Sequence, residues 1–190
     1  MTAPTPRPHF TLSLTPTSPT CSLTSTPRFG LHLTLTLHRT SPSPLTLSLA
    51  KTPLKELHGL EEIAHITDPS GTEVEFPWGI GCWEYDEPFP SDEVFEEFEP
   101  GVPFEETFWL IRKGPGAQGG ELECLEKGAE YSVRVSSYLL ASFGKWRWGR
   151  KGELLAGGLE EKREKWKGRD GDGRGRIVVE VSEPFTFRTV

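Results

Sequence analysis

The chain has 190 residues, a formal net charge of −7 and 35% apolar residues, which suits one domain over residues 1–190 and excludes disorder along the whole chain. No run of about 18 apolar residues is present, so we expect no membrane-spanning segment and no membrane partner. The 20 glycines and 17 prolines favour short strands joined by turns over long helices.

The N-terminus and the cysteines indicate in which compartment of the cell the protein is expected. Thr, Ser and Pro interrupt the apolar stretch that a secretory signal would need, and the first eight residues are expected to be flexible. Cys21, Cys82 and Cys124 are scattered, which argues against a disulfide framework or a zinc site. The sequence therefore predicts an intracellular, cytoplasmic protein without a cofactor.

Charge is segregated along the chain. Residues 1–50 contain no acidic residue, residues 56–108 contain no basic residue, and residues 109–190 contain more basic than acidic residues. This pattern predicts either that the acidic and basic segments meet in the fold, or that the molecule has two surfaces with different partners.

The first fifty residues contain three alternating segments. In 29–38 (FGLHLTLTLH), apolar residues at odd positions alternate with Gly, His and Thr, which is the period of a half-buried strand. Shorter alternations occur at Phe10, Leu12 and Leu14 and at Leu45, Leu47 and Leu49. His32 and His38 share the outer face of the long strand but lie about 20 Å apart along it, too far to bind one metal ion.

A turn and two strands are predicted next. Residues 68–71 (DPSG) have the residue preferences of a type I turn, and strands are expected at 62–67 and 72–76. His58 and His65 lie near acidic residues in this region, but surface histidines are the more common reading and we assign no metal site.

Residues 77–91 form an aromatic loop rich in Pro and Gly, followed by acidic residues up to 99. Exposed aromatic and acidic side chains predict a binding surface, and the binding residues assigned here are Trp83, Tyr85, Asp86, Glu87 and Phe89. Paired carboxylates beside aromatic rings are also the ingredients of a carbohydrate-active enzyme, and calcium binding by these acids is a further alternative. Cys82 is the one thiol in this loop worth testing for reactivity.

Residues 91–124 are predicted to contain a helical turn and a strand. Ser91 can cap one or two helical turns that place Val94, Phe95 and Phe98 on one face. Residues 102–113 (VPFEETFWLIRK) look like a strand, and 114–120 a hairpin tip.

Residues 125–136 (LEKGAEYSVRVS) carry a glycine three residues before a tyrosine, and then Val133 and Val135 in alternation. Gly128 would supply a tight turn, and the Tyr131 ring would fill the core while its hydroxyl bonds to upstream backbone. The stretch resembles the E–F corner of fibronectin type III and related immunoglobulin-like domains. The resemblance implies an all-β, immunoglobulin-like β-sandwich with long decorated loops. As a whole, the chain also looks like uncharacterised β proteins of filamentous fungi, which implies no activity.

The C-terminal third contains a second candidate surface. In 145–151 (KWRWGRK), Trp146 and Trp148 would share one face of a strand with Arg147 between them. Stacking rings beside cations are typical of nucleic-acid grooves. The net charge of −7 would repel a polyanion, which favours core tryptophans flanked by solvated cations. Residues 159–176 are predicted to start as a short helix and to be largely a mobile charged loop, and 177–190 to end the chain in two strands.

No catalytic motif is found. The sequence has no G-x-S-x-G elbow, no phosphate-binding glycine loop, and no Ser or Cys in a recognisable motif with His. We therefore expect a non-enzymatic interaction module that binds another protein through the acidic-aromatic loop or the tryptophan segment. The alternatives are nucleic-acid binding through 145–176 and a carboxylate-dependent carbohydrate-active enzyme.

Overall fold

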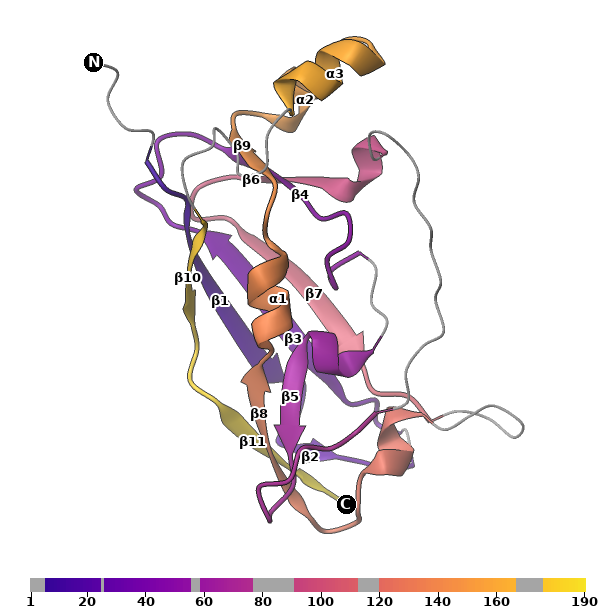
Figure 1. Cartoon of the computed structure of the whole chain (residues 1–190). Helices are drawn as coiled ribbons and strands as arrows, with labels where there is room; N and C mark the ends of the chain where they lie inside the picture. Colours follow the sequence, from indigo (N-terminus) through magenta and orange to yellow (C-terminus); the bar gives the residue numbers. More distant parts are fainter. Residues whose placement is uncertain (1–5, 25, 56–58, 77–90, 113–119, 167–175) are drawn as a thin grey trace.

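The molecule is built mostly of short β-strands, as Figure 1 shows. The computed structural model describes residues 6–24, 26–55, 59–76, 91–112, 120–166 and 176–190. The strands are β1 (His9–Pro16), β2 (Thr20–Cys21), β3 (Gly30–Leu37), β4 (Leu45–Ser48), β5 (Ala64–Thr67), β6 (Phe95–Phe98), β7 (Pro103–Trp109), β8 (Glu130–Val135), β9 (Trp146–Trp148), β10 (Val178–Val181) and β11 (Phe185–Thr189).

Helices are short and few among the described residues. They are α1 (Ser137–Ser142), α2 (Lys151–Leu154) and α3 (Leu159–Lys165), with single 3-10 turns η1 (Leu60–Glu62), η2 (Asp92–Val94) and η3 (Glu121–Cys124). None of the helices in the described segments is long and apolar enough to cross a bilayer. The expectation of a mostly β protein with at most short helices is confirmed.

Strand β3 has the alternation that the sequence predicts. Phe29 and the four leucines that follow at odd positions are at most 1% exposed, whereas His32, Thr34 and Thr36 face outward and are partly exposed. Burying each leucine side chain contributes about 2 kcal/mol. Because β3 pairs antiparallel with both β1 and β7, its leucines lie at the centre of an apolar face.

The strands form three sheets. Sheet A has the order β10-β1-β3-β7, sheet B the order β2-β11-β8-β5, and sheet C the order β6-β4-β9. Most neighbours are antiparallel, but β1 and β10 are parallel, as are β2 and β11. These two parallel pairs join strands near the start of the chain to strands near its end.

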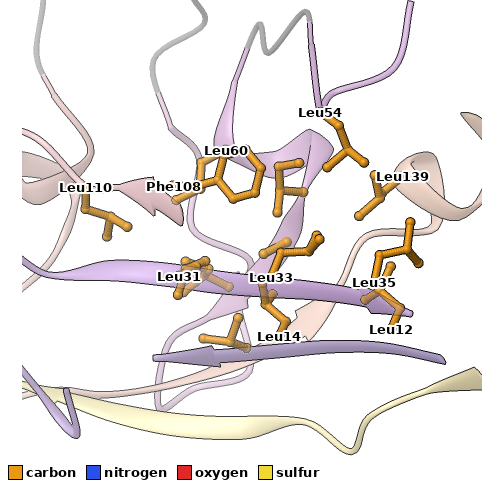
Figure 2. Close-up of a cluster of buried hydrophobic side chains, with 14 of the residues drawn as sticks. Leu12, Leu14, Leu31, Leu33, Leu35, Leu54, Leu60, Phe108, Leu110 and Leu139 are labelled. Carbon is orange, nitrogen blue, oxygen red and sulfur yellow. The ribbon is translucent and has the colours of Figure 1, made fainter. Parts of the chain in front are cut away.

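The core lies against the inner face of sheet A. Figure 2 shows the leucines of β1 and β3 facing apolar side chains of the segment before η1, of η1 itself, of β7 and of α1. The labelled members are Leu12, Leu14, Leu31, Leu33, Leu35, Leu54, Leu60, Phe108, Leu110 and Leu139. One continuous cluster therefore includes residues from the first third to the last third of the chain.

One helical turn forms after Ser91, as predicted, and strand β6 then takes the place of a second turn. Ser91 does cap η2, where its hydroxyl accepts a hydrogen bond from the Glu93 N–H at 3.4 Å, but the chain then becomes extended and pairs with β4. Phe95 and Phe98 are three residues apart, a spacing that puts them on one side of a helix but on opposite faces of a strand. Each phenylalanine is buried in a different cluster, Phe98 in the main core and Phe95 in a smaller one. The extended strand therefore allows both side chains to be buried.

The predicted turn at 68–71 forms, but the strand after it does not. The Gly71 N–H donates to the Asp68 carbonyl at 2.9 Å, and the Asp68 carboxylate accepts from the Ser70 and Thr72 N–H groups, each at 2.9 Å. These bonds keep Thr72 within the turn. As a result, the returning segment meets β5 through only an isolated bridge between Thr67 and Glu73.

The corner around Tyr131 has the geometry expected from the sequence. Gly128 has φ +81°, a conformation that costs glycine nothing, and Tyr131 is 2% exposed. The Tyr131 hydroxyl accepts a hydrogen bond from the Glu126 N–H at 2.7 Å, and its ring stacks on Phe187 of β11 at 5.5 Å. The predicted bond from the tyrosine to upstream backbone is confirmed.

Candidate functional site

Eight residues are assigned to binding from the sequence. Five of them lie outside the described residues: Trp83, Tyr85, Asp86, Glu87 and Phe89. The same holds for Cys82 and His58.

The tryptophan segment lies largely inside the molecule. Trp146 is 1% exposed and Arg147 is 8% exposed, while Trp148 is partly exposed and donates its indole N–H to the Pro6 carbonyl at 3.0 Å. Base stacking needs an open ring face, which Trp146 does not offer. Of the two sequence interpretations, the burial of Trp146 favours a core tryptophan over a stacking platform.

Arg147 holds α3 against sheet C. Its Nε donates to the Lys165 carbonyl at 3.0 Å, and its guanidinium lies 5.8 Å from the centre of the Trp166 ring. Trp166 in turn packs on Phe95 of β6 at 4.6 Å between ring centres. The Arg147 guanidinium therefore binds the C-terminal end of α3, where a positive charge also interacts favourably with the helix dipole.

Acidic and basic segments meet in the fold. Arg150 lies 3.0 Å from Glu97 and 2.7 Å from Glu99, and Lys162 lies 2.6 Å from Asp92. These ion pairs join β6 and η2 to α2 and α3. Among the described residues, the first interpretation of the charge segregation is thus confirmed, and these charges are already engaged within the molecule.

A serine, a histidine and a glutamate form a line near the start of α1. Ser136 Oγ lies 3.4 Å from His65 Nε2, and His65 Nδ1 contacts the Glu73 carboxylate. The order matches a nucleophile, a base and an orienting acid. No sequence motif indicates this arrangement, because the three residues come from three separate segments.

The burial of these side chains argues against catalysis. Glu73 is the most exposed of the three side chains and His65 is 24% exposed, whereas Ser136 is 1% exposed. In a hydrolytic triad the serine is exposed to substrate and the acid is buried, which is the opposite of the exposures found here. Ser136 Oγ also accepts the Tyr138 N–H at 3.2 Å as the cap of α1, so the line is best explained as support for the α1 corner.

Four carboxylates lie beside the Asp68 turn, and Asp68 among them is not suited to be a general acid. Asp68, Glu73, Glu75 and Glu126 border an open depression of about 340 Å³ next to Tyr131. A glycosidase needs one carboxyl group kept protonated. The Ser70 hydroxyl and the Thr72 N–H instead hold the pKa of Asp68 below its ordinary value, which keeps it ionised. In the described segments, no three His, Cys, Asp or Glu side chains gather as they would around a metal ion.

The outer edge of β7 is an open strand edge with binding character in the described part of the molecule. The Leu110 N–H donates to the Phe29 carbonyl at 3.0 Å, which fixes the phase of the β3–β7 ladder. Residues at even positions of β7 therefore turn their backbone groups toward β3, and Glu105, Thr107 and Trp109 turn theirs outward. No other strand in the described part of the chain pairs with this edge.

Contacts at the edge agree with this phase. The Thr107 N–H donates a hydrogen bond to the Glu106 carboxylate at 3.4 Å and not to β3. Further along, the Ile111 N–H donates to Glu121 at 3.1 Å, and the Ile111 carbonyl accepts from Leu122 of η3 at 3.3 Å. The open stretch therefore runs from Pro103 to Trp109 and ends where η3 begins.

Large apolar side chains flank the open edge. Trp109 is 45% exposed, Ile111 is 48% exposed and Val102 is 55% exposed. The Trp109 ring lies over Gly30 of β3, so closely that a Cβ at Gly30 would be 2.9 Å from it. This packing holds the ring in one orientation while leaving almost half of the residue open to solvent.

The sequence predicted the strand at 102–113 but did not mark it as a site. Its two adjacent glutamates and single tryptophan have no distinctive spacing, and edge position depends on the order of strands in the sheet.

Comparisons with known proteins add no assignment: no protein-family model matches the chain, and no curated protein matches it significantly.

Proposed function

We propose that the protein is a non-enzymatic interaction module, and that its contact surface is the open edge of β7 together with Trp109. The observation that carries the proposal is a seven-residue strand with one unpaired edge in the described part of the molecule, ended by an exposed and oriented tryptophan. Exposed aromatic residues held in one conformation lose little entropy on binding and are frequent anchors of interfaces.

The proposed architecture around this surface is an immunoglobulin-like sandwich of sheets A and B, decorated by sheet C and the short helices. The corner bond between Tyr131 and Glu126 supports this, and so does the packing of the Tyr131 ring on β11. The parallel pairs and the third sheet depart from simple immunoglobulin-like domains.

We place the module inside the cell, because Cys21 and Cys124 are both free thiols.

Affinity capture with a matched pair of variants tests the function. The tagged protein is used to capture partners from lysate of its source cells, with and without nuclease, and is compared with Trp109→Ala and Tyr138→Ala. Tyr138 is 52% exposed on α1, outside strand β7, and serves as the control. We expect nuclease-resistant capture of a protein partner that is lost with Trp109→Ala and retained with Tyr138→Ala.

Other results of the capture would contradict the proposal. Equal capture by Trp109→Ala and the wild type would remove the β7 edge as the contact surface. Capture that disappears after nuclease treatment would favour the nucleic-acid alternative, in which exposed cations such as Lys145 bind phosphate.

A further inference from the structure

We infer that the occupant of the β7 edge is an extended peptide segment carrying Lys or Arg, which adds to sheet A as a fifth strand. This inference rests on the proposed function and specifies the partner. It is carried by three features of β7: outward backbone groups, a local excess of negative charge, and the position of Trp109.

The backbone supplies the attachment points. Glu105, Thr107 and Trp109 each direct an N–H and a carbonyl away from β3, and Pro103 adds a carbonyl. An extended peptide can pair with this row by ladder hydrogen bonds, as in other cases of strand addition to an open sheet edge. The Glu106 carboxylate that covers the Thr107 N–H in the free protein is a side chain that can move aside.

Charge specifies the kind of peptide. Glu105 has 57% of its side chain exposed, and Glu106 beside it is also exposed. Opposite charges on adjacent strands stabilise pairing, whereas like charges directly opposite each other destabilise it. A strand that presents Lys or Arg to both faces of β7 beside these glutamates is therefore favoured.

The same charges disfavour a second copy of this chain. If two β7 edges paired with each other, the glutamates of one copy would lie next to those of the other across the new ladder. Charged residues on edge strands, including those that point toward the inner face as Glu106 does, are a common device against such self-pairing. A partner of different sequence and opposite charge escapes this restriction.

Trp109 sets the end of the bound segment. Its side chain is on the outer face together with Glu105 and Thr107, because alternate residues of a strand share a face. A bound strand would place an apolar residue against the exposed part of this ring, and η3 would stop the pairing beyond it. The expected ligand is thus about seven residues long, since strands rise about 3.4 Å per residue and pair residue by residue.

The test uses a heptapeptide in both chain directions, capped and labelled for fluorescence anisotropy, and the full-length protein. The peptide has two adjacent lysines to face Glu105 and Glu106, a valine three residues further on to face Trp109, and threonine at the other positions. The key variant is Thr107→Pro, which removes an outward N–H but no bond to β3, and proline is tolerated at such edge positions. Thr107→Val is the matched control, because it keeps the N–H and loses only the hydroxyl that bonds His32 Nδ1. We expect Thr107→Pro to weaken binding about tenfold or more and Thr107→Val about twofold or less.

A charge exchange provides a second, independent measurement. A peptide with Glu in place of Lys should not bind the wild type, and the double variant Glu105→Lys, Glu106→Lys should prefer it over the Lys peptide. This arm decides the question even if Thr107→Pro lowers stability enough to disturb the strand.

Three results with the peptides would overturn the inference. They are absence of binding by the Lys peptide, equal binding of the Lys and Glu peptides, and equal affinity of the wild type and Thr107→Pro. If Trp109→Ala nevertheless abolishes capture of the natural partner, the proposed function stands without strand addition. Self-association of the wild type that Thr107→Pro removes, measured by sedimentation velocity, would identify a second copy as the occupant and overturn the inference as well.

Discussion

Tyr131 shows what a single polar atom contributes in the core. Replacing Tyr131 by Phe keeps the ring on Phe187 but leaves the Glu126 N–H without its acceptor. Because a part-buried donor without a partner is costly, we expect Tyr131→Phe to lower the free energy of unfolding by about 1–2 kcal/mol.

Urea denaturation of the wild type and two tyrosine variants measures this effect. Tyr138 is exposed, so Tyr138→Phe should change the free energy of unfolding by about 0.5 kcal/mol or less. Equal losses from the two substitutions would show that the corner bond has no special role.

The sequence predicts residue partners best where the partners are close in the chain. Gly128, Tyr131 and the upstream backbone lie within six residues, so their arrangement follows from local geometry. Trp146 and Arg147 are different. Alternation predicts that neighbouring residues face opposite ways, but only the packing of distant elements decides which face is covered, and here α3 covers the Arg147 side.

At the scale of elements, the attachment of α3 depends on Arg147. Replacing Arg147 by Met keeps much of the side-chain volume but removes the hydrogen bond to the Lys165 carbonyl and the charge beside the Trp166 ring. We expect a loss of about 2 kcal/mol in the free energy of unfolding, and faster proteolytic cleavage after Lys162 and Arg163 by trypsin as α3 detaches.

Arg150 provides the matched control for this experiment. Its side chain is 56% exposed and its ion pairs with Glu97 and Glu99 are at the surface, so Arg150→Met should cost about 1 kcal/mol or less. If both variants lose the same stability, the buried position of Arg147 is not what secures the helix.

Strands with a plain period of two were predictable, and elements whose form depends on a neighbour were not. β1, β3, β4 and β8 lie where alternation placed them. β6 was expected to be helical because Phe95 and Phe98 are three residues apart, a spacing that fits either a helix with one apolar face or a strand with two. The second apolar cluster, which includes Trp166 from a distant helix, decides between them.

At the scale of the whole molecule, burial of Cys21 couples stability to alkaline pH. The thiol is 0% exposed, and burial raises its pKa from 9.0 to about 11 in the folded protein. Between pH 9 and 11 the unfolded chain therefore loses this proton more readily than the folded one, and stability falls as the pH rises through that range.

Denaturation at a series of pH values measures the coupling. Cys21→Ala should flatten the decline between pH 9 and 11, while Cys124, whose pKa burial also raises, still contributes to the slope. A variant with the same alkaline slope as the wild type would show that Cys21 does not contribute.

The order of the strands could not be predicted, and with it the candidate site. The strand at 102–113 is visible in the sequence, yet its role as an open edge follows from pairing between segments far apart, such as β1 with β10. Such pairings depend on long-range packing that local patterns do not encode.

The place of β11 between β2 and β8 has a consequence during translation. β1, β3 and β7 can pair once residue 109 has left the ribosome, but β2 has no partner in sheet B until Phe185–Thr189 emerges. For much of its synthesis the nascent chain thus carries a formed sheet whose leucine face is incompletely covered. Chaperones bind exposed apolar surface of this kind. We therefore expect chaperones to bind the nascent chain until Phe185–Thr189 has emerged.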